Sequence, residues 1–257
     1  MISEKAEISP KAKIGKNVTI YPFVYIEDDV VIGDDCVIYP YVSIMNGTRL
    51  GRGNKVFQNT VLGALPQDFH YCGDATQLVI GDDNIIRENV VINRATFCNG
   101  QTVIGNRNFI MEGVHVSHDT KIADDCVFGY GTKIAGDCEI YDNVICSSNV
   151  IINPGSRIGD AVMVSSGCRV SKDVPPYILA NGNPVLYSGL NASILNKLGI
   201  SEKTQSHMAN AYRLVFHGQT SIIDAIAQVK EQVPDDPEIR NIVTFLSNTK
   251  LGVIGKI

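Results

Sequence analysis

An aliphatic residue recurs at every sixth position over the first two thirds of this sequence. A frame of six residues runs from Ile8 to Val170, and 23 of its 28 positions are Ile, Leu or Val. A period of six fits neither an α-helix, with its period of 3.6, nor an ordinary strand, with its period of 2. The remaining frame positions are Asp68, Asp74, Cys98, Phe128 and Cys146.

The period fits a solenoid in which each six-residue segment places one aliphatic side chain inside. Three such segments make a triangular coil of 18 residues, and successive coils stack about 4.8 Å apart. Many Gly, Asn and Asp residues suit the tight corners. The pattern predicts a mainly β protein, a parallel β-helix of hexapeptide repeats, and resembles the left-handed form of a large acyltransferase family. A β-helix that serves only as a rod remains the alternative, because a fold alone does not define a function.

The frame stops after Val170, where Pro175 and Pro176 cannot continue a ladder of strand hydrogen bonds. Helical patterns follow over residues 190–198, from Ser201 to about Gly218, over 222–229, and from Asp236-Pro237 onward. We therefore expect a β-helix domain over residues 1–186 and a small α-helical C-terminal domain over residues 187–257.

Two segments interrupt the repeat, residues 64–78 and residues 93–102. The first loses the inward aliphatic residues at positions 68 and 74, and the second loses the one at position 98. Packing gives no reason for such excursions, so both are candidates for ligand contact. A harmless insertion is the other interpretation.

Composition narrows the possible functions. The net charge of −5 argues against general affinity for nucleic acid or anionic membranes. No apolar run reaches the roughly 18 residues of a membrane span, and the N-terminus lacks the pattern of a signal peptide. The seven cysteines form no CxxC pair, so we expect them to be reduced and mostly structural in a cytoplasmic protein.

Histidines near the interruptions are the best candidates for chemistry. His115 and His118 flank the inward Val116, so their side chains should point out of the coil wall. Asp119 could orient the imidazole of His118 or stabilise its charge. Gly136 stands one coil further on, where a free N–H could stabilise an oxyanion beside a general base.

Five segments resemble the family of acyltransferases that transfer an acyl chain from acyl-acyl carrier protein to UDP-N-acetylglucosamine, at the start of lipid A synthesis. The resemblance covers nearly the whole chain. The segments that carry it are residues 63–71 (GALPQDFHY), 80–89 (IGDDNIIREN), 115–119 (HVSHD), 173–177 (DVPPY) and 189–191 (GLN).

The resemblance implies a role for each matching residue. His118 would be the general base, Asp119 its carboxylate neighbour, and the Gly136 N–H the oxyanion donor. Substrate contacts would come from Gln67, Asp68, His70, His115, Asn153, Ser166, Asn191 and Lys197. It also implies a homotrimer with sites between subunits, acyl carrier protein and a nucleotide sugar as partners, and no cofactor or metal.

Several positions depart from the family pattern. Asp137 and Asn153 stand where histidines are usual, His70 where a lysine is usual, and Ser193 where a glutamate is usual. Residues 196–199 read Asn-Lys-Leu-Gly in place of a more basic segment, which weakens phosphate recognition. Ser166 aligns with the position that limits acyl-chain length in the family. Serine is larger than the glycine of members with a long acyl groove, so we expect a groove shorter than the longest in the family.

Three alternatives follow. The same machinery could acylate a 3-amino or otherwise modified UDP-sugar. A zinc site of the carbonic anhydrase kind would need a third ligand beside His115 and His118, which the sequence does not supply convincingly. A non-catalytic scaffold is the third.

An acidic carrier protein would need a local basic patch, for which the candidates are Arg169, Lys172, Lys197, Lys203 and Arg213.

Overall fold

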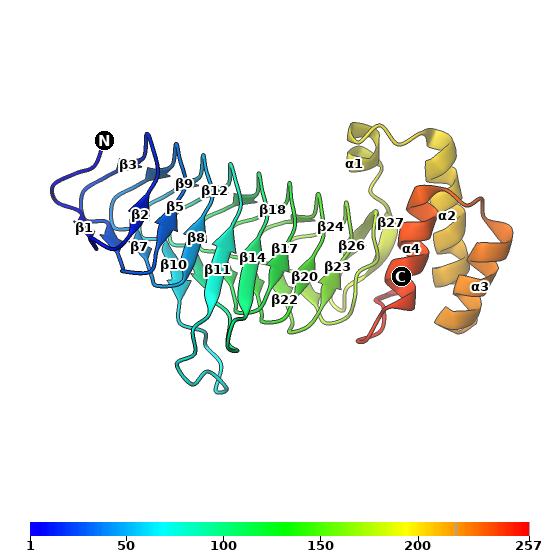
Figure 1. The fold of residues 1–257 in the computed structure, drawn as a ribbon. Coiled ribbons are helices and arrows are strands. Elements are labelled where there is room, and N and C mark those ends of the chain that lie inside the picture. The colour runs from blue at the N-terminus through cyan, green and yellow to red at the C-terminus, as the bar shows by residue number, and fades with distance from the viewer. Residues whose placement is uncertain (219, 257) are drawn as a thin grey trace.

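The computed structural model describes residues 1–218 and 220–256 as a solenoid of short parallel strands that ends in a group of helices (Figure 1). The first sheet contains β1 (Glu7–Ile8), β4 (Tyr25–Ile26), β7 (Ser43–Ile44), β10 (Val61–Ala64), β13 (Val91–Asn93), β16 (His115–Val116), β19 (Lys133–Ile134), β22 (Ile151–Ile152) and β25 (Arg169–Val170). The second contains β2 (Lys13–Ile14), β5 (Val31–Ile32), β8 (Thr48–Leu50), β11 (Gln77–Ile80), β14 (Gln101–Ile104), β17 (Lys121–Ile122), β20 (Glu139–Ile140) and β23 (Arg157–Ile158).

The third sheet closes the triangle. It contains β3 (Thr19–Ile20), β6 (Val37–Ile38), β9 (Lys55–Val56), β12 (Ile85–Ile86), β15 (Phe109–Ile110), β18 (Val127–Phe128), β21 (Ile145–Cys146), β24 (Met163–Val164), β26 (Ile178–Asn181), β27 (Leu186–Leu190) and β28 (Gly255–Lys256). The pairing register between strands gives the number of residues in each coil. Val61 pairs with Ser43, 18 residues earlier, and with Val91, 30 residues later. Val91 pairs in turn with His115, 24 residues later, so two successive coils are longer than the 18-residue repeat, as the interruptions predict.

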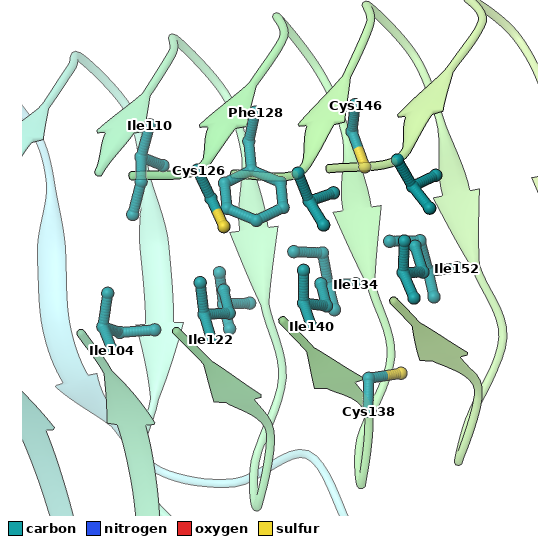
Figure 2. Packing of buried hydrophobic residues seen from close by; sticks show 14 of the residues in the cluster. Ile104, Ile110, Ile122, Cys126, Phe128, Ile134, Cys138, Ile140, Cys146 and Ile152 are labelled. Carbon is teal, nitrogen blue, oxygen red and sulfur yellow. The ribbon is translucent and has the colours of Figure 1, made fainter. Parts of the chain in front are cut away.

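The inward frame forms one continuous core (Figure 2). Phe128 and Cys146 occupy the frame as fully buried residues, so these two exceptions keep the inward orientation. All seven cysteines are free, and only Cys72 and Cys98, which lie in the two interruptions, are exposed.

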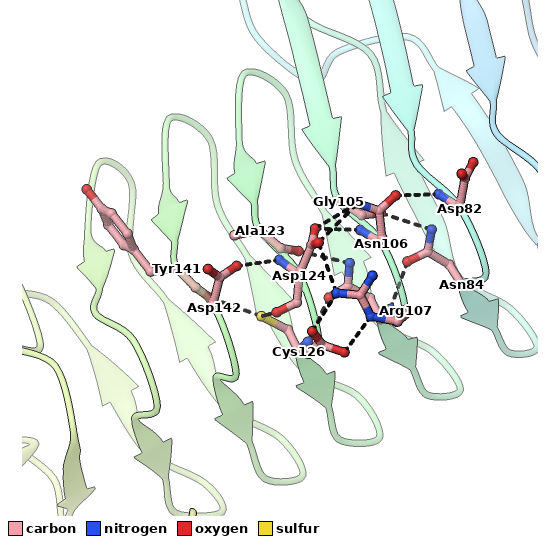
Figure 3. A network of polar contacts seen from close by, with 12 residues as sticks. Asp82, Asn84, Gly105, Asn106, Arg107, Ala123, Asp124, Cys126, Tyr141 and Asp142 are labelled. Atoms are coloured by element: carbon pink, nitrogen blue, oxygen red, sulfur yellow. Dashed lines mark hydrogen bonds and ion pairs between the residues drawn. The ribbon is translucent and has the colours of Figure 1, made fainter. Parts of the chain in front are cut away.

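Carboxylate and amide side chains connect the coils at the corner between the second and third sheets (Figure 3). The side chains of Asn106, Asp124 and Asp142 each accept a hydrogen bond from a backbone N–H one coil earlier, at 2.8 Å. These bonds satisfy corner N–H groups that the strand ladders leave free, which explains the Asn and Asp enrichment.

The C-terminal helices follow the expected segments: α1 (Ala192–Lys197), α2 (Glu202–His217), α3 (Ile222–Gln232) and α4 (Pro237–Ser247). Ser201 caps α2 by accepting the N–H of Thr204. The helices are tied to the solenoid, because β27 and β28 extend the third sheet and Arg157 contacts both Asp173 and the carbonyl of Phe245. Positions 219 and 257 of the expected helical domain lie outside the described residues. Within the described residues no helix combines the length and hydropathy needed to cross a bilayer.

Candidate functional site

Successive coils bring both interruptions to one corner of the solenoid, between the first and second sheets. Residues 65–76 connect β10 to β11 and project from the solenoid, in cyan in Figure 1. Residues 94–100 connect β13 to β14 at the same corner. The next corners along this edge, after β16 and β19, carry His118 and Gly136. The interruptions therefore lie beside the residues predicted to act chemically.

His118 is 9% exposed and is held by a carboxylate. Its Nδ1 lies 2.9 Å from Asp119 Oδ2. The Thr96 N–H donates to the same oxygen at 3.1 Å, and the Asp119 N–H donates to Thr102 Oγ1 at 2.9 Å. With Nδ1–H donated to Asp119, Nε2 carries the lone pair that a general base needs.

Asp68 faces the other nitrogen of His118. Its Oδ2 lies 3.6 Å from His118 Nε2, too far for a hydrogen bond. Its Oδ1 accepts the backbone N–H of His70 at 2.8 Å and contacts His70 Nδ1 at 2.7 Å. These hydrogen bonds lower the pKa of Asp68, so it stays ionised opposite His118. Gln67 precedes it on the exposed side of the loop.

Gly136 lies directly against the imidazole. A Cβ at this position would be 2.5 Å from His118 Cε1 and 2.8 Å from Nε2, so only glycine allows the ring to occupy this place. Its φ is outside the left-handed region, so the requirement is steric. Within the part of the chain that the structure describes, its N–H has no hydrogen-bond partner and is available beside the ring.

His115, Asn153 and Asp137 lie along the same edge. His115 points outward from β16, beside Lys133 of β19, and burial together with the charge of Lys133 lowers its pKa. Asn153 accepts a hydrogen bond from Arg169 Nε at 3.2 Å. Partial desolvation raises the pKa of Asp137, and the negative charge of Asp119 adds to this.

The other predicted contacts lie elsewhere on the chain. Ser166 is exposed at the corner between the third and first sheets. Asn191 precedes α1, is 3% exposed, and donates to the carbonyl of Ala161 at 3.0 Å. Lys197 is exposed at the end of α1. Within one chain, these three residues therefore do not lie at the His118 corner.

The structure adds Thr96 and Thr102 as residues that orient Asp119. The interruption over residues 93–102 predicted a functional segment here, but no sequence pattern identified these two threonines. The basic candidates Arg169, Lys172, Lys197, Lys203 and Arg213 are all exposed. Among the described residues, no three His, Cys, Asp or Glu side chains come together as a metal site.

A hexapeptide-repeat β-helix in which half-buried Asp119 holds buried His118 at a corner fits a transferase of the hexapeptide class. The sequence agrees: residues 6–46 and 101–136 match the bacterial transferase hexapeptide model, and residues 173–254 match domain 2 of UDP-N-acetylglucosamine O-acyltransferase. The chain belongs to the UDP-N-acetylglucosamine O-acyltransferase family.

Relatives similar over their full length support this membership. The acyl-[acyl-carrier-protein]–UDP-N-acetylglucosamine O-acyltransferase of Thermodesulfovibrio yellowstonii is 36% identical over 253 residues, 98% of each chain. The crystal structure of the UDP-N-acetylglucosamine acyltransferase from Bacteroides fragilis 9343 gives a TM-score of 0.97 at 47% identity, covering 99% of this chain and 100% of its own. The Francisella novicida enzyme gives 0.96 at 31% identity, covering 100% and 94%. The left-handed β-helix with a small helical C-terminal domain, predicted from the sequence, is confirmed.

Proposed function

We propose that this protein transfers a 3-hydroxyacyl chain from acyl-acyl carrier protein to the 3-hydroxyl of UDP-N-acetylglucosamine, the first step of lipid A biosynthesis. The observation that carries the proposal is the Asp119–His118–Asp68 arrangement, in which Nε2 of a mostly buried imidazole is free to take a proton. The curated relatives are named acyl-[acyl-carrier-protein]–UDP-N-acetylglucosamine O-acyltransferases, which supports acyl transfer to an oxygen of this nucleotide sugar.

The reaction needs one base and one oxyanion site, because a thioester is already activated. His118 Nε2 takes the proton of the sugar hydroxyl as that oxygen bonds to the thioester carbon. Asp119 stabilises the imidazolium that forms. The Gly136 N–H is the expected donor to the tetrahedral oxyanion. When the carbon–sulfur bond breaks, the proton passes from His118 to the carrier's thiolate.

The active assembly is a cytoplasmic homotrimer in this proposal. Asp68, His115 and Asn153 gather at the His118 corner, whereas Ser166, Asn191 and Lys197 lie on other parts of the same chain. A second subunit beside that corner would bring the two groups into one cleft, and a solenoid wall alone is too flat to enclose a ligand. The exposed bases of the C-terminal third would meet the acidic carrier.

A 3-amino UDP-sugar is the second acceptor to test. Asp68, Asp119 and Asp137 place three carboxyl groups around His118, and their mutual repulsion contributes to the raised pKa of Asp137. Such a negative field attracts an amino acceptor in its cationic form.

The direct experiment is turnover by the purified protein with a panel of acyl-acyl carrier proteins and both acceptors. We expect ester formation on UDP-N-acetylglucosamine, lost in His118→Ala with the trimer intact by sedimentation. The exposed His217 provides the matched control, His217→Ala, which should keep the wild-type rate. No turnover with any donor or acceptor would refute the enzymatic function.

A further inference from the structure

The loop that carries Asp68 has little apolar packing to hold it. Pro66 and Thr76 are buried at its ends, but no side chain of residues 67–75, all of which the structure describes, is buried between them. A cavity of about 540 Å³ lies against the loop and is lined mainly by polar groups, including Asp74 and Arg94. The position of Asp68 must therefore depend on specific polar contacts.

Arg94 supplies a side-chain contact to the middle of the loop. It follows β13 directly, and its backbone N–H donates to the carbonyl of Ala64 at 3.0 Å. Its Nη1 donates to the carbonyl of Asn46 at 2.7 Å, and its Nη2 donates to Tyr71 Oη at 2.7 Å. The guanidinium also lies 5.8 Å from the centre of the Tyr71 ring. The guanidinium fork thus joins the loop to the solenoid, with one hydrogen bond to Asn46 in the solenoid and one to Tyr71 in the loop.

Tyr71 connects this fork to Asp68. Its hydroxyl accepts from Arg94 and donates to the carbonyl of Asp74 at 3.3 Å, which closes the end of the loop. Its backbone N–H donates to the carbonyl of Asp68 at 3.2 Å. The contacts therefore run without a break from the wall through Arg94 and Tyr71 to the residue that faces His118.

We infer that Arg94 is a positioning residue that acts through the Tyr71 hydroxyl to hold Asp68 opposite His118 Nε2. The inference rests on the proposed function for its effect on rate, and on the structure alone for its effect on the loop. A displacement of about 1 Å at a reacting centre costs on the order of 100-fold in rate. Loss of the Tyr71 hydroxyl should therefore lower kcat/KM by about 10- to 100-fold.

The test is a double-mutant cycle of Tyr71→Phe with Asp68→Asn, combined with amide hydrogen exchange of residues 65–76. We expect Tyr71→Phe to lower kcat/KM, to speed exchange in the loop, and to cause no further loss of rate in the Asp68→Asn background. Arg94→Lys, which keeps the charge but not the fork, should give the same pattern. Tyr41→Phe is the matched control, because within the described residues the exposed Tyr41 hydroxyl makes no hydrogen bond.

Independent, multiplying losses in the cycle would overturn the inference, as would unchanged loop exchange in Tyr71→Phe. If the wild-type protein transfers no acyl chain, the proposed function fails, and loop exchange in Tyr71→Phe and Arg94→Lys then decides the inference alone.

Discussion

Replacing Gly136 with alanine separates two reasons for having a glycine beside His118. The substitution keeps the backbone N–H, the expected oxyanion donor, and adds a Cβ that would lie 2.5 Å from His118 Cε1. Because φ at Gly136 is not in the left-handed region, alanine suits the backbone there. The imidazole must therefore move while the rest of the coil stays in place.

The expected magnitude follows from that overlap. Ordinary contact with a Cβ begins at about 3.4 Å, so the ring must shift by close to 1 Å. A shift of this size at a catalytic group costs about 100-fold in rate, equivalent to about 2.7 kcal/mol of transition-state stabilisation. We expect the loss in kcat. Stability should change little, because the ring can move towards the solvent side of the corner.

The assay is steady-state kinetics of Gly136→Ala, with thermal melting to check the fold. In a His118→Ala background the same substitution has no ring to displace, so it should not lower the residual rate further. A near-wild-type rate in Gly136→Ala would refute the need for the close approach. A further loss in the His118→Ala background would instead indicate an effect on the oxyanion donor.

Three further predictions concern the carboxylates. Asp119→Asn should lower kcat by about 10²- to 10⁴-fold, because the base loses its charge partner and its fixed tautomer; the pH–rate profile measures this. Asp173→Ala should cost about 3–5 kcal/mol in urea unfolding, because Asp173 is 1% exposed and its loss leaves the charge of Arg157 without a carboxylate partner; Asp235→Ala, in an exposed ion pair, should cost under about 1 kcal/mol. Burial alone would raise the pKa of Asp124, but hydrogen bonds from the preceding coil outweigh it and lower the pKa below its ordinary 3.8. Its contribution to stability is thus present above about pH 4 and lost as pH falls through the lower folded value, so Asp124→Asn should flatten acid unfolding curves.

The sequence predicts the fold because one strict period governs the whole solenoid. Each six-residue segment points one aliphatic residue inward and ends at one corner. The pattern therefore repeats wherever core packing alone determines the type of the inward residue. Phe128 and Cys146 depart from the aliphatic pattern but stay buried, because the core accepts any apolar side chain of suitable volume. The two real breaks in the period are loops, and both lie at the His118 corner.

The sequence predicts less of the site, because side-chain contacts there cross between coils. His118 and Asp119 are neighbours in sequence, so their pairing could be predicted. The approach of Asp68 to Nε2 depends on how a 12-residue loop is held, and the period contains no information on that path. Thr96, which orients Asp119 from 23 residues earlier, carries no recognisable signal for the same reason.

Gly136 illustrates why a correct choice of residue does not establish its role. One coil of separation places its backbone beside His118, and a free N–H there suits an oxyanion. The structure adds a steric reason that applies even without that role, because the imidazole occupies the space of a Cβ. The two reasons reinforce each other, since a ring held against a backbone N–H would keep the proposed base beside the attacking hydroxyl and the proposed oxyanion donor beside the carbonyl that it attacks. A glycine at this position therefore fixes the distance between the two functions, and a side chain of any size would separate them.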